Sequence, residues 1–265
     1  MDYSGYQTMA TQRDGRLLTL TLNRPERGNT VDGLMHRELA RIFNDIAMDD
    51  ETDVVIFTGA GDAFSAGGDI RWMHSILDTG CGMTEIAIEG KRILTSLLDL
   101  EKPIICRMNG DAIGLGATLA LFCDIIIADE NARIADPHVR VGLVAGDGGA
   151  VIWPHLIGAA RAKAFLMTGD MLTAREAADM GMVNKAVPAD QVDAEVTRMA
   201  SKLLRGAQHA IRWTKMSVNL GLRQTVNAVF DTSLAYEVAA SLLPAHREGV
   251  MAFLEKRHAD FSKKA

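Results

Sequence analysis

The sequence has few cysteines, few aromatic residues and no long apolar runs. Its three cysteines, Cys81, Cys106 and Cys123, are an odd number without the spacing of a metal site. Cys106 and Cys123 lie in or beside apolar segments, which predicts buried thiols in a reducing compartment. No apolar run reaches the roughly 18 residues of a membrane-spanning helix, so we expect no membrane association.

Clustered basic charge is also scarce. Lys and Arg number 28 against 34 Asp and Glu, the net charge is −6, and no long basic run occurs. This balance disfavours nucleic acid or a membrane surface as the main partner, although it is compatible with a local basic patch. The first twenty or so residues lack the charged head, apolar core and cleavage site of a secretory signal, so the expected location is the cytoplasm.

Apolar residues make up 48% of the chain, enough for a substantial core. Strand-like segments alternate with helical patterns over roughly the first 190 residues, and an almost wholly helical tail follows. This alternation predicts an α/β core with largely parallel strands. The main expected strands cover residues 16–22, 53–59, 102–110 and 124–130, and a loop is expected at 78–84.

Two glycine turns connect strand-like segments to helical ones: "AFSAGGDI" at 63–70 and "NGDAIGLGATLAL" at 109–121. The first backbone N–H groups of a helix are unpaired and favour a negative oxygen. Two such turns facing one cavity would aim two donors at one oxyanion, as enolate or tetrahedral chemistry on a thioester requires. Alternatively, the glycines serve only tight turns. A dinucleotide site is disfavoured, because the third glycine of that fingerprint is missing and the first strand is not adjacent.

Several separated blocks resemble the crotonase superfamily, also called the enoyl-CoA hydratase/isomerase family. They are "AFSAGGDI", residues 102–137, "GLVAGDGG", "LMTGDMLTAREAADMGMVNKAVP" and "EGVMAFLEKRHADF", and they occur in the family's order from about residue 16 to 261. The resemblance implies a crotonase fold, in which a spiral of ββα units precedes a C-terminal helical trimerisation region. It also implies acyl-CoA substrates, with no cofactor beyond the substrate's coenzyme A and no metal. We therefore expect a CoA-binding, catalytic core at 1–195 and a helical oligomerisation region at 196–265 in a homotrimer or hexamer.

The resemblance further implies site residues. The backbone N–H groups of Ala66 and Leu115 would form the oxyanion hole, and the turn around Arg27 would hold the adenine. Phe253 and Lys256 would reach the CoA of a neighbouring subunit; otherwise they would be a core residue and a solvated charge. The remaining expected CoA-binding residues are Ala63, Ser65, Gly67, Gly68, Asp69, Ile70, Gly114 and Thr118, and Trp72 and Met73 are expected to line the acyl pocket.

The chain departs from the hydratase pattern at both catalytic glutamates. One falls at Thr118 and the other at His138, so the conventional pair that activates water and protonates Cα is missing. His138 and Asp147, nine residues apart across a glycine-containing turn, are a possible replacement. In this interpretation Asp147 fixes the imidazole tautomer while His138 draws a proton from water.

A third carboxylate, Glu237, is expected on a C-terminal helix. Together with His138 and Asp147 it resembles the β-diketone hydrolase branch of the superfamily, of which 6-oxocamphor hydrolase is the type. His36 falls near a histidine of that branch. Because both glycine turns are retained here, a CoA thioester is still the expected substrate. Purely structural roles are also open. His138 would then be a hydrogen-bonded histidine in a turn and Asp147 a turn or N-cap residue. Glu237 and His36 would be helix residues on solvated faces.

Two reactions are compatible with these residues. One is hydration or isomerisation of an enoyl-CoA, with His138 and Asp147 in place of the glutamates. The other is hydrolytic carbon–carbon cleavage (retro-Claisen) of a β-oxoacyl-CoA or cyclic β-diketone, in which water activated by His138 attacks the keto carbon. A non-catalytic, RNA-associated member is a third possibility, and the acidic net charge and complete oxyanion motif speak against it.

Overall fold

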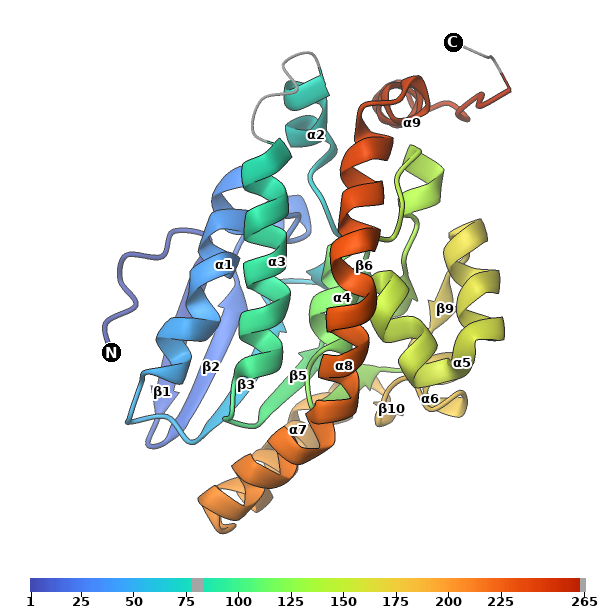
Figure 1. Cartoon of the computed structure of the whole chain (residues 1–265). Helices are drawn as coiled ribbons and strands as arrows, with labels where there is room; N and C mark the ends of the chain where they lie inside the picture. Colours follow the sequence, from blue (N-terminus) through green and yellow to red (C-terminus); the bar gives the residue numbers. More distant parts are fainter. Residues whose placement is uncertain (78–82, 263–265) are drawn as a thin grey trace.

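The computed structural model describes residues 1–77 and 83–262. Two sheets form its centre (Figure 1). In the larger sheet, β1 and β2 are antiparallel and every other neighbouring pair is parallel. Its strands, in spatial order, are β1 (Met9–Asp14), β2 (Leu17–Leu22), β3 (Val54–Gly59), β5 (Ile104–Met108), β7 (Ile125–Asp129) and β10 (Lys185–Val187).

The smaller sheet consists of short strands that directly follow strands of the larger one. Each of β3, β5 and β7 leads into a short strand and then a helix, which is the expected spiral of ββα units. The short strands are β4 (Ala63–Ser65), β6 (Asp111–Ile113), β8 (Arg133–Ala135) and β9 (Leu172–Thr173). The helices that follow β4, β6 and β8 are α2 (Ile70–Leu77), α4 (Leu115–Leu121) and, after the 3₁₀ turn η2 (His138–Val141), α5 (Gly149–Thr168).

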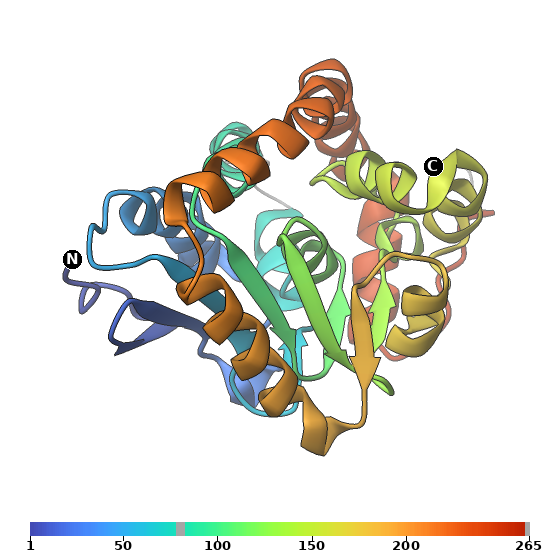
Figure 2. The ribbon, with the colours of Figure 1, turned by 90° about the horizontal axis from the view of Figure 1, so that it is seen from below.

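The larger sheet is covered on both faces, which explains the unbroken apolar run of β3. All six of its residues are buried. One face packs against α1 (Gly33–Ala47) and α3 (Met83–Asp99) and the other against α7 (Ala189–Leu204), which crosses the sheet in Figure 2. A strand with helices on both sides buries every side chain and therefore shows no alternation.

The C-terminal region is helical, as expected. The 34-residue α8 (Gln208–Ser241) packs against α3 and α5, and α9 (Pro244–Leu254) packs against α2. The predicted boundary between residues 195 and 196 falls inside α7, whose apolar side packs on the larger sheet. The first C-terminal helix beyond the one that packs on that sheet is therefore α8. The domain division stays a prediction.

Several smaller expectations are also resolved. Cys106 and Cys123 are buried free thiols, as predicted. The helix α5 has a kink at Gly158, whose φ and ψ are not helical. Cys81 and most of the predicted 78–84 loop lie outside the described residues, and α3 already begins at Met83. Among the described residues no helix is long and apolar enough to cross a membrane.

The short or polar strands β1, β4, β6 and β9 were not expected from the sequence. β1 alternates with few apolar residues, and the other three have only two or three residues each. The predicted turn before α1 contains the 3₁₀ helix η1 (Pro25–Arg27). The small helix α6 (Ala174–Asp179) ends at a glycine with positive φ, Gly181, as its pattern predicts.

The aromatic centre of the core gives a test of this packing. Phe57 on β3 is fully buried, and its ring lies edge-on between Phe43 at 5.8 Å and Phe64 at 5.2 Å. We expect Phe57→Ala to lower the free energy of unfolding by about 3–5 kcal/mol, because it removes a large buried side chain and leaves a cavity. Urea titration measures the change. Phe57→Leu is the matched control, and a loss below about 1 kcal/mol for the alanine variant would contradict this account of the core.

Candidate active site

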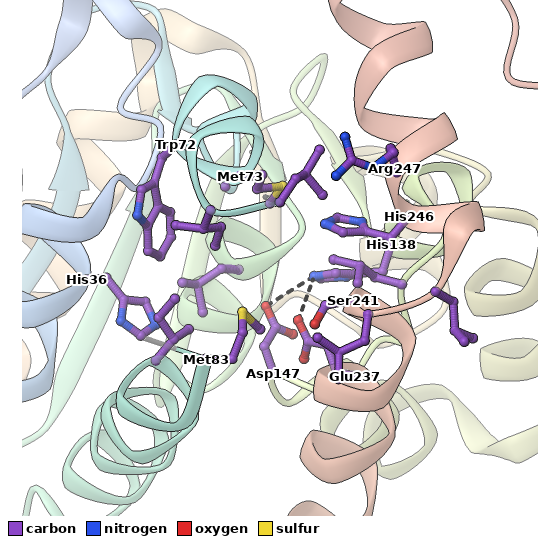
Figure 3. A pocket seen from close by; sticks show the side chains of 18 of the residues that line it. His36, Trp72, Met73, Met83, His138, Asp147, Glu237, Ser241, His246 and Arg247 are labelled. Atoms are coloured by element: carbon purple, nitrogen blue, oxygen red, sulfur yellow. Dashed lines mark ion pairs between the residues drawn. The ribbon is translucent and has the colours of Figure 1, made fainter. Parts of the chain in front are cut away.

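A cavity of about 320 Å³ lies between α2 and α3 on one side and α8 and α9 on the other (Figure 3). Its wall on the α2 and α3 side is largely apolar, and Trp72 and Met73 are part of it, as predicted. The opposite wall carries most of the polar groups. They are His138, Asp147, Glu237, Ser241, His246 and Arg247.

His138 lies at the centre of the polar wall. It opens η2 directly after the Asp-Pro turn that follows β8, and it is buried. Its Nδ1 pairs with the carboxylate of Asp136. Its Nε2 lies 3.5 Å from Asp147 Oδ2 and 3.9 Å from Glu237 Oε1 (Figure 3). Segments distant in the sequence thus bring three carboxylates around one imidazole.

Burial sets the charges of this cluster. Burial alone lowers the pKa of His138, but the three surrounding carboxylates outweigh it and raise that pKa well above its usual value. Burial also raises the pKa of the Asp147 carboxyl, and it raises the pKa of Glu237 to about 8. At neutral pH the geometry therefore favours an imidazolium at His138 beside a protonated Glu237.

The glycine-rich loop 145–149 lets the carboxylates approach. A Cβ on Gly146 would lie 2.5 Å from the Ser233 carbonyl oxygen and 2.6 Å from Cβ of Glu237, which is closer than side chains tolerate. A Cβ on Gly149 would collide with Oδ2 of Asp136. Glycine at these two positions thus leaves the room that Glu237 and Asp136 occupy.

The structure brings together His138, Asp147 and Glu237, as the sequence predicted, but it changes the partner of the imidazole. The tautomer-fixing role was expected of Asp147, whereas Asp136 is the carboxylate on Nδ1. The available signal was an aspartate two residues before the histidine, at the end of a strand. Asp147 lies on the other side of the ring, and its Oδ1 is 3.2 Å from Thr118 Oγ1.

The predicted oxyanion donor at Ala66 requires correction. Its N–H donates to the carbonyl of Gly28 at 2.9 Å, so it is already used. Gly68 lines the cavity, as does Leu115, and over residues 1–77 and 83–262 neither backbone N–H donates a hydrogen bond. The two glycine turns are adjacent, because β4 pairs with β6. The available donor pair is therefore Gly68 and Leu115.

The other residues expected to bind CoA are not part of the cavity wall. Ser65 donates its hydroxyl to the Asn29 carbonyl at 2.8 Å, and Asp69 accepts the N–H of Arg71 at 2.9 Å, so both stabilise the first glycine turn. The remainder lie in the two turns or at exposed positions, and their contacts with CoA stay predictions: Arg27, Ala63, Gly67, Ile70, Gly114, Thr118, Phe253 and Lys256.

Comparisons with known proteins support the expected family and fold. The family model described as enoyl-CoA hydratase/isomerase matches residues 12–264. The crotonyl-CoA hydratase of Syntrophomonas wolfei is 33% identical over 98% of this chain and 99% of its own length. The structure of an enoyl-CoA hydratase/isomerase from Mycobacterium paratuberculosis superposes with a TM-score of 0.90 at 34% identity, covering 94% of this chain and 99% of the other. A β-diketone hydrolase from Anabaena, solved with (S)-3-oxocyclohexyl acetic acid, gives a TM-score of 0.83 at 30% identity and covers 91% and 96% of the two chains.

The raised pKa of Glu237 predicts a pH-dependent stability. Between pH 4.5, the ordinary pKa of the carboxyl, and about pH 8, Glu237 ionises in the unfolded chain but keeps its proton in the folded one. The contribution of Glu237 to the free energy of unfolding therefore falls as the pH rises. Glu237→Gln removes the titration. We expect the stability of the Gln variant relative to the parent to rise with pH over this range, by at most about 1.4 kcal/mol per pH unit.

Urea titrations at several pH values between about 5 and 8 measure this difference. The exposed Glu101→Gln is the matched control. A difference between Glu237→Gln and its parent that is constant across the range would contradict the buried, protonated carboxyl.

Proposed function

The chain belongs to the enoyl-CoA hydratase/isomerase family, and from that premise we propose that it adds water to the double bond of an enoyl-CoA thioester. The observation that carries the proposal is the position of Asp147. Its carboxylate reaches the hydroxyl of Thr118, where the resemblance expects one glutamate, and lies 3.5 Å from His138, which replaces the other. A carboxylate and an imidazolium in one cavity supply the base and the acid that hydration requires.

The thioester oxygen would accept hydrogen bonds from the backbone N–H groups of Gly68 and Leu115. Both residues line the cavity that contains His138. Fixed backbone donors stabilise the negative charge that develops on this oxygen when the enolate forms. This pair replaces the Ala66 and Leu115 pair expected from the sequence.

The proton steps follow from the charges of the cluster. Asp147 accepts a proton from water as the water oxygen bonds to Cβ, and the π electrons move onto the thioester to give the enolate. His138 then gives its Nε2 proton to Cα, and the proton held by Asp147 restores the imidazolium. Asp136 stabilises the cation through Nδ1. The proposal thus makes His138 the acid, because its pKa is raised, whereas the sequence suggested a base.

The same groups support hydrolytic carbon–carbon cleavage as a second candidate. The observations that favour it are Glu237, 3.9 Å from the imidazole, and the similarity to a β-diketone hydrolase. Water would attack the keto carbon with Asp147 as base, the bond to Cα would break, and its electrons would form the thioester enolate. Protonation of Cα by His138 would complete the reaction. Both candidate reactions use the same base and the same acid, so they differ only in the substrate.

We expect the purified protein to convert crotonyl-CoA to 3-hydroxybutyryl-CoA, and His138→Gln to lower kcat by about 10²- to 10⁴-fold because the proton donor is lost. Liquid chromatography with mass detection follows the products, and the exposed His155→Gln is the matched control. Release of acetyl-CoA from 3-oxohexanoyl-CoA, without hydration of crotonyl-CoA, would favour the second candidate. Full activity in His138→Gln would exclude the role assigned to the imidazole.

A homotrimer or hexamer is proposed on separate grounds. Large apolar side chains on α8, on α9 and in the turn between them are well exposed in the single chain, among them Trp213 at 64%, Leu242 at 67% and Phe253 at 62%. Exposed apolar surface of this extent is typical of subunit contacts. We expect light scattering to give three or six times the 28.7 kDa chain mass. A monomer at micromolar concentration would contradict both this assembly and a shared CoA site at Phe253 and Lys256.

A further inference from the structure

One polar pair in the cavity takes no part in the proposed steps. His36 lies on α1, is 5% exposed and lines the cavity. Its Nδ1 is 2.8 Å from Oε2 of Glu89 on α3, whose side chain is also mostly buried. Figure 3 shows His36 on the wall opposite His138.

The surroundings of His36 are apolar. Its ring lies against Trp72, with centroids 5.7 Å apart. Val31, Ile76 and Ile86 are further residues of the cavity wall. A polar ring atom buried in such surroundings costs free energy unless it is hydrogen-bonded. Glu89 satisfies Nδ1, whereas Nε2 has no hydrogen-bond partner in the part of the chain that the structure describes. Nε2 is not one of the fully buried unpaired atoms, and His36 lines the cavity, where a bound molecule can reach it.

Gly90 of α3 lies near Nε2 of His36. A Cβ built on Gly90 of α3 would be 4.0 Å from Nε2 of His36 and 4.0 Å from Cδ1 of Leu234. Leu234 lies on α8 one turn before Glu237. Nε2 therefore lies beside α3, near Gly90 and close to Leu234 of α8.

We propose that Nε2 of His36 hydrogen-bonds to a second oxygen on the acyl chain, so that the preferred substrate is an oxygenated enoyl thioester rather than a plain alkenoyl thioester. This inference rests on the proposed function and names the substrate class of the same site. With Nδ1–H donated to Glu89, the neutral ring accepts a hydrogen bond from a hydroxyl group at Nε2, whereas the protonated ring donates one to a keto oxygen. A buried group that needs a hydrogen-bond partner discriminates strongly against a substrate that lacks it.

The experiment compares kcat/KM for three thioesters: trans-2-hexenoyl-CoA and its 6-hydroxy and 5-oxo analogues. We expect the wild-type protein to prefer at least one oxygenated analogue by about 10- to 100-fold. His36→Leu should abolish that preference, mainly by raising KM for the oxygenated analogues. The exposed His155→Leu is the matched control and should keep the preference.

Further variants separate specificity from packing. Gly90→Ala adds a methyl group 4.0 Å from Nε2 while His36 and Glu89 stay in place, and it should also reduce the preference. This variant serves as the test if His36→Leu does not fold. If the ring of His36 binds the substrate as a cation, Glu89→Gln should lower kcat/KM for the 5-oxo analogue alone.

The outcomes distinguish the two levels of the proposal. Turnover of none of the three thioesters would contradict the proposed function itself. Turnover of hexenoyl-CoA with no preference for either analogue, or an equal preference in wild type, His36→Leu and Gly90→Ala, would overturn only this inference. In that case the contact between His36 and Glu89 would only stabilise the packing of α1 against α3.

Discussion

Three carboxylates, those of the buried Asp136 and the mostly buried Asp147 and Glu237, surround the imidazole of His138. Like charges at this separation cannot all remain ionised away from water. The cluster therefore depends on a positive imidazole at its centre and on a proton retained by Glu237, whose pKa is raised to about 8. The positions of the strands, the loop and the long helix around this cluster all serve to bring these four groups together.

The fold supplies each carboxylate from a different element. Asp136 stands at the end of β8, Asp147 in the loop before α5 and Glu237 in the last third of α8. The loop can approach both neighbours because Gly146 and Gly149 have no side chains. The first turn of α5 adds a favourable field, since the positive end of a helix dipole stabilises a nearby carboxylate. Burial and backbone geometry together thus place a proton donor and a proton acceptor in one small cavity.

Under the proposed function, a catalytic position is filled from another part of the chain. Thr118 replaces a glutamate in the hydratase pattern, yet the carboxylate of Asp147 reaches the same place from a loop nearly thirty residues later. Acid and base chemistry requires groups at positions in space and not at positions in the sequence. The same principle applies across the cavity, where His36, paired with Glu89, places one polar ring on a largely apolar wall.

The sequence by itself determined the α/β alternation, the helical tail, the glycine turns and the family. These features are carried by local periodicity and by contiguous motifs, which do not depend on distant contacts. It also selected His138, Asp147 and Glu237, although through the resemblance and not through geometry.

Only the tertiary structure decided which partner each group has. The N–H of Ala66 is bonded to Gly28, which leaves Gly68 as the available donor beside Leu115. Asp136 pairs with Nδ1 because the Asp-Pro turn folds back at the end of β8. Hydrogen-bond partners depend on the direction of individual N–H and C=O groups, and those directions are fixed only when strands and helices from distant segments pack together.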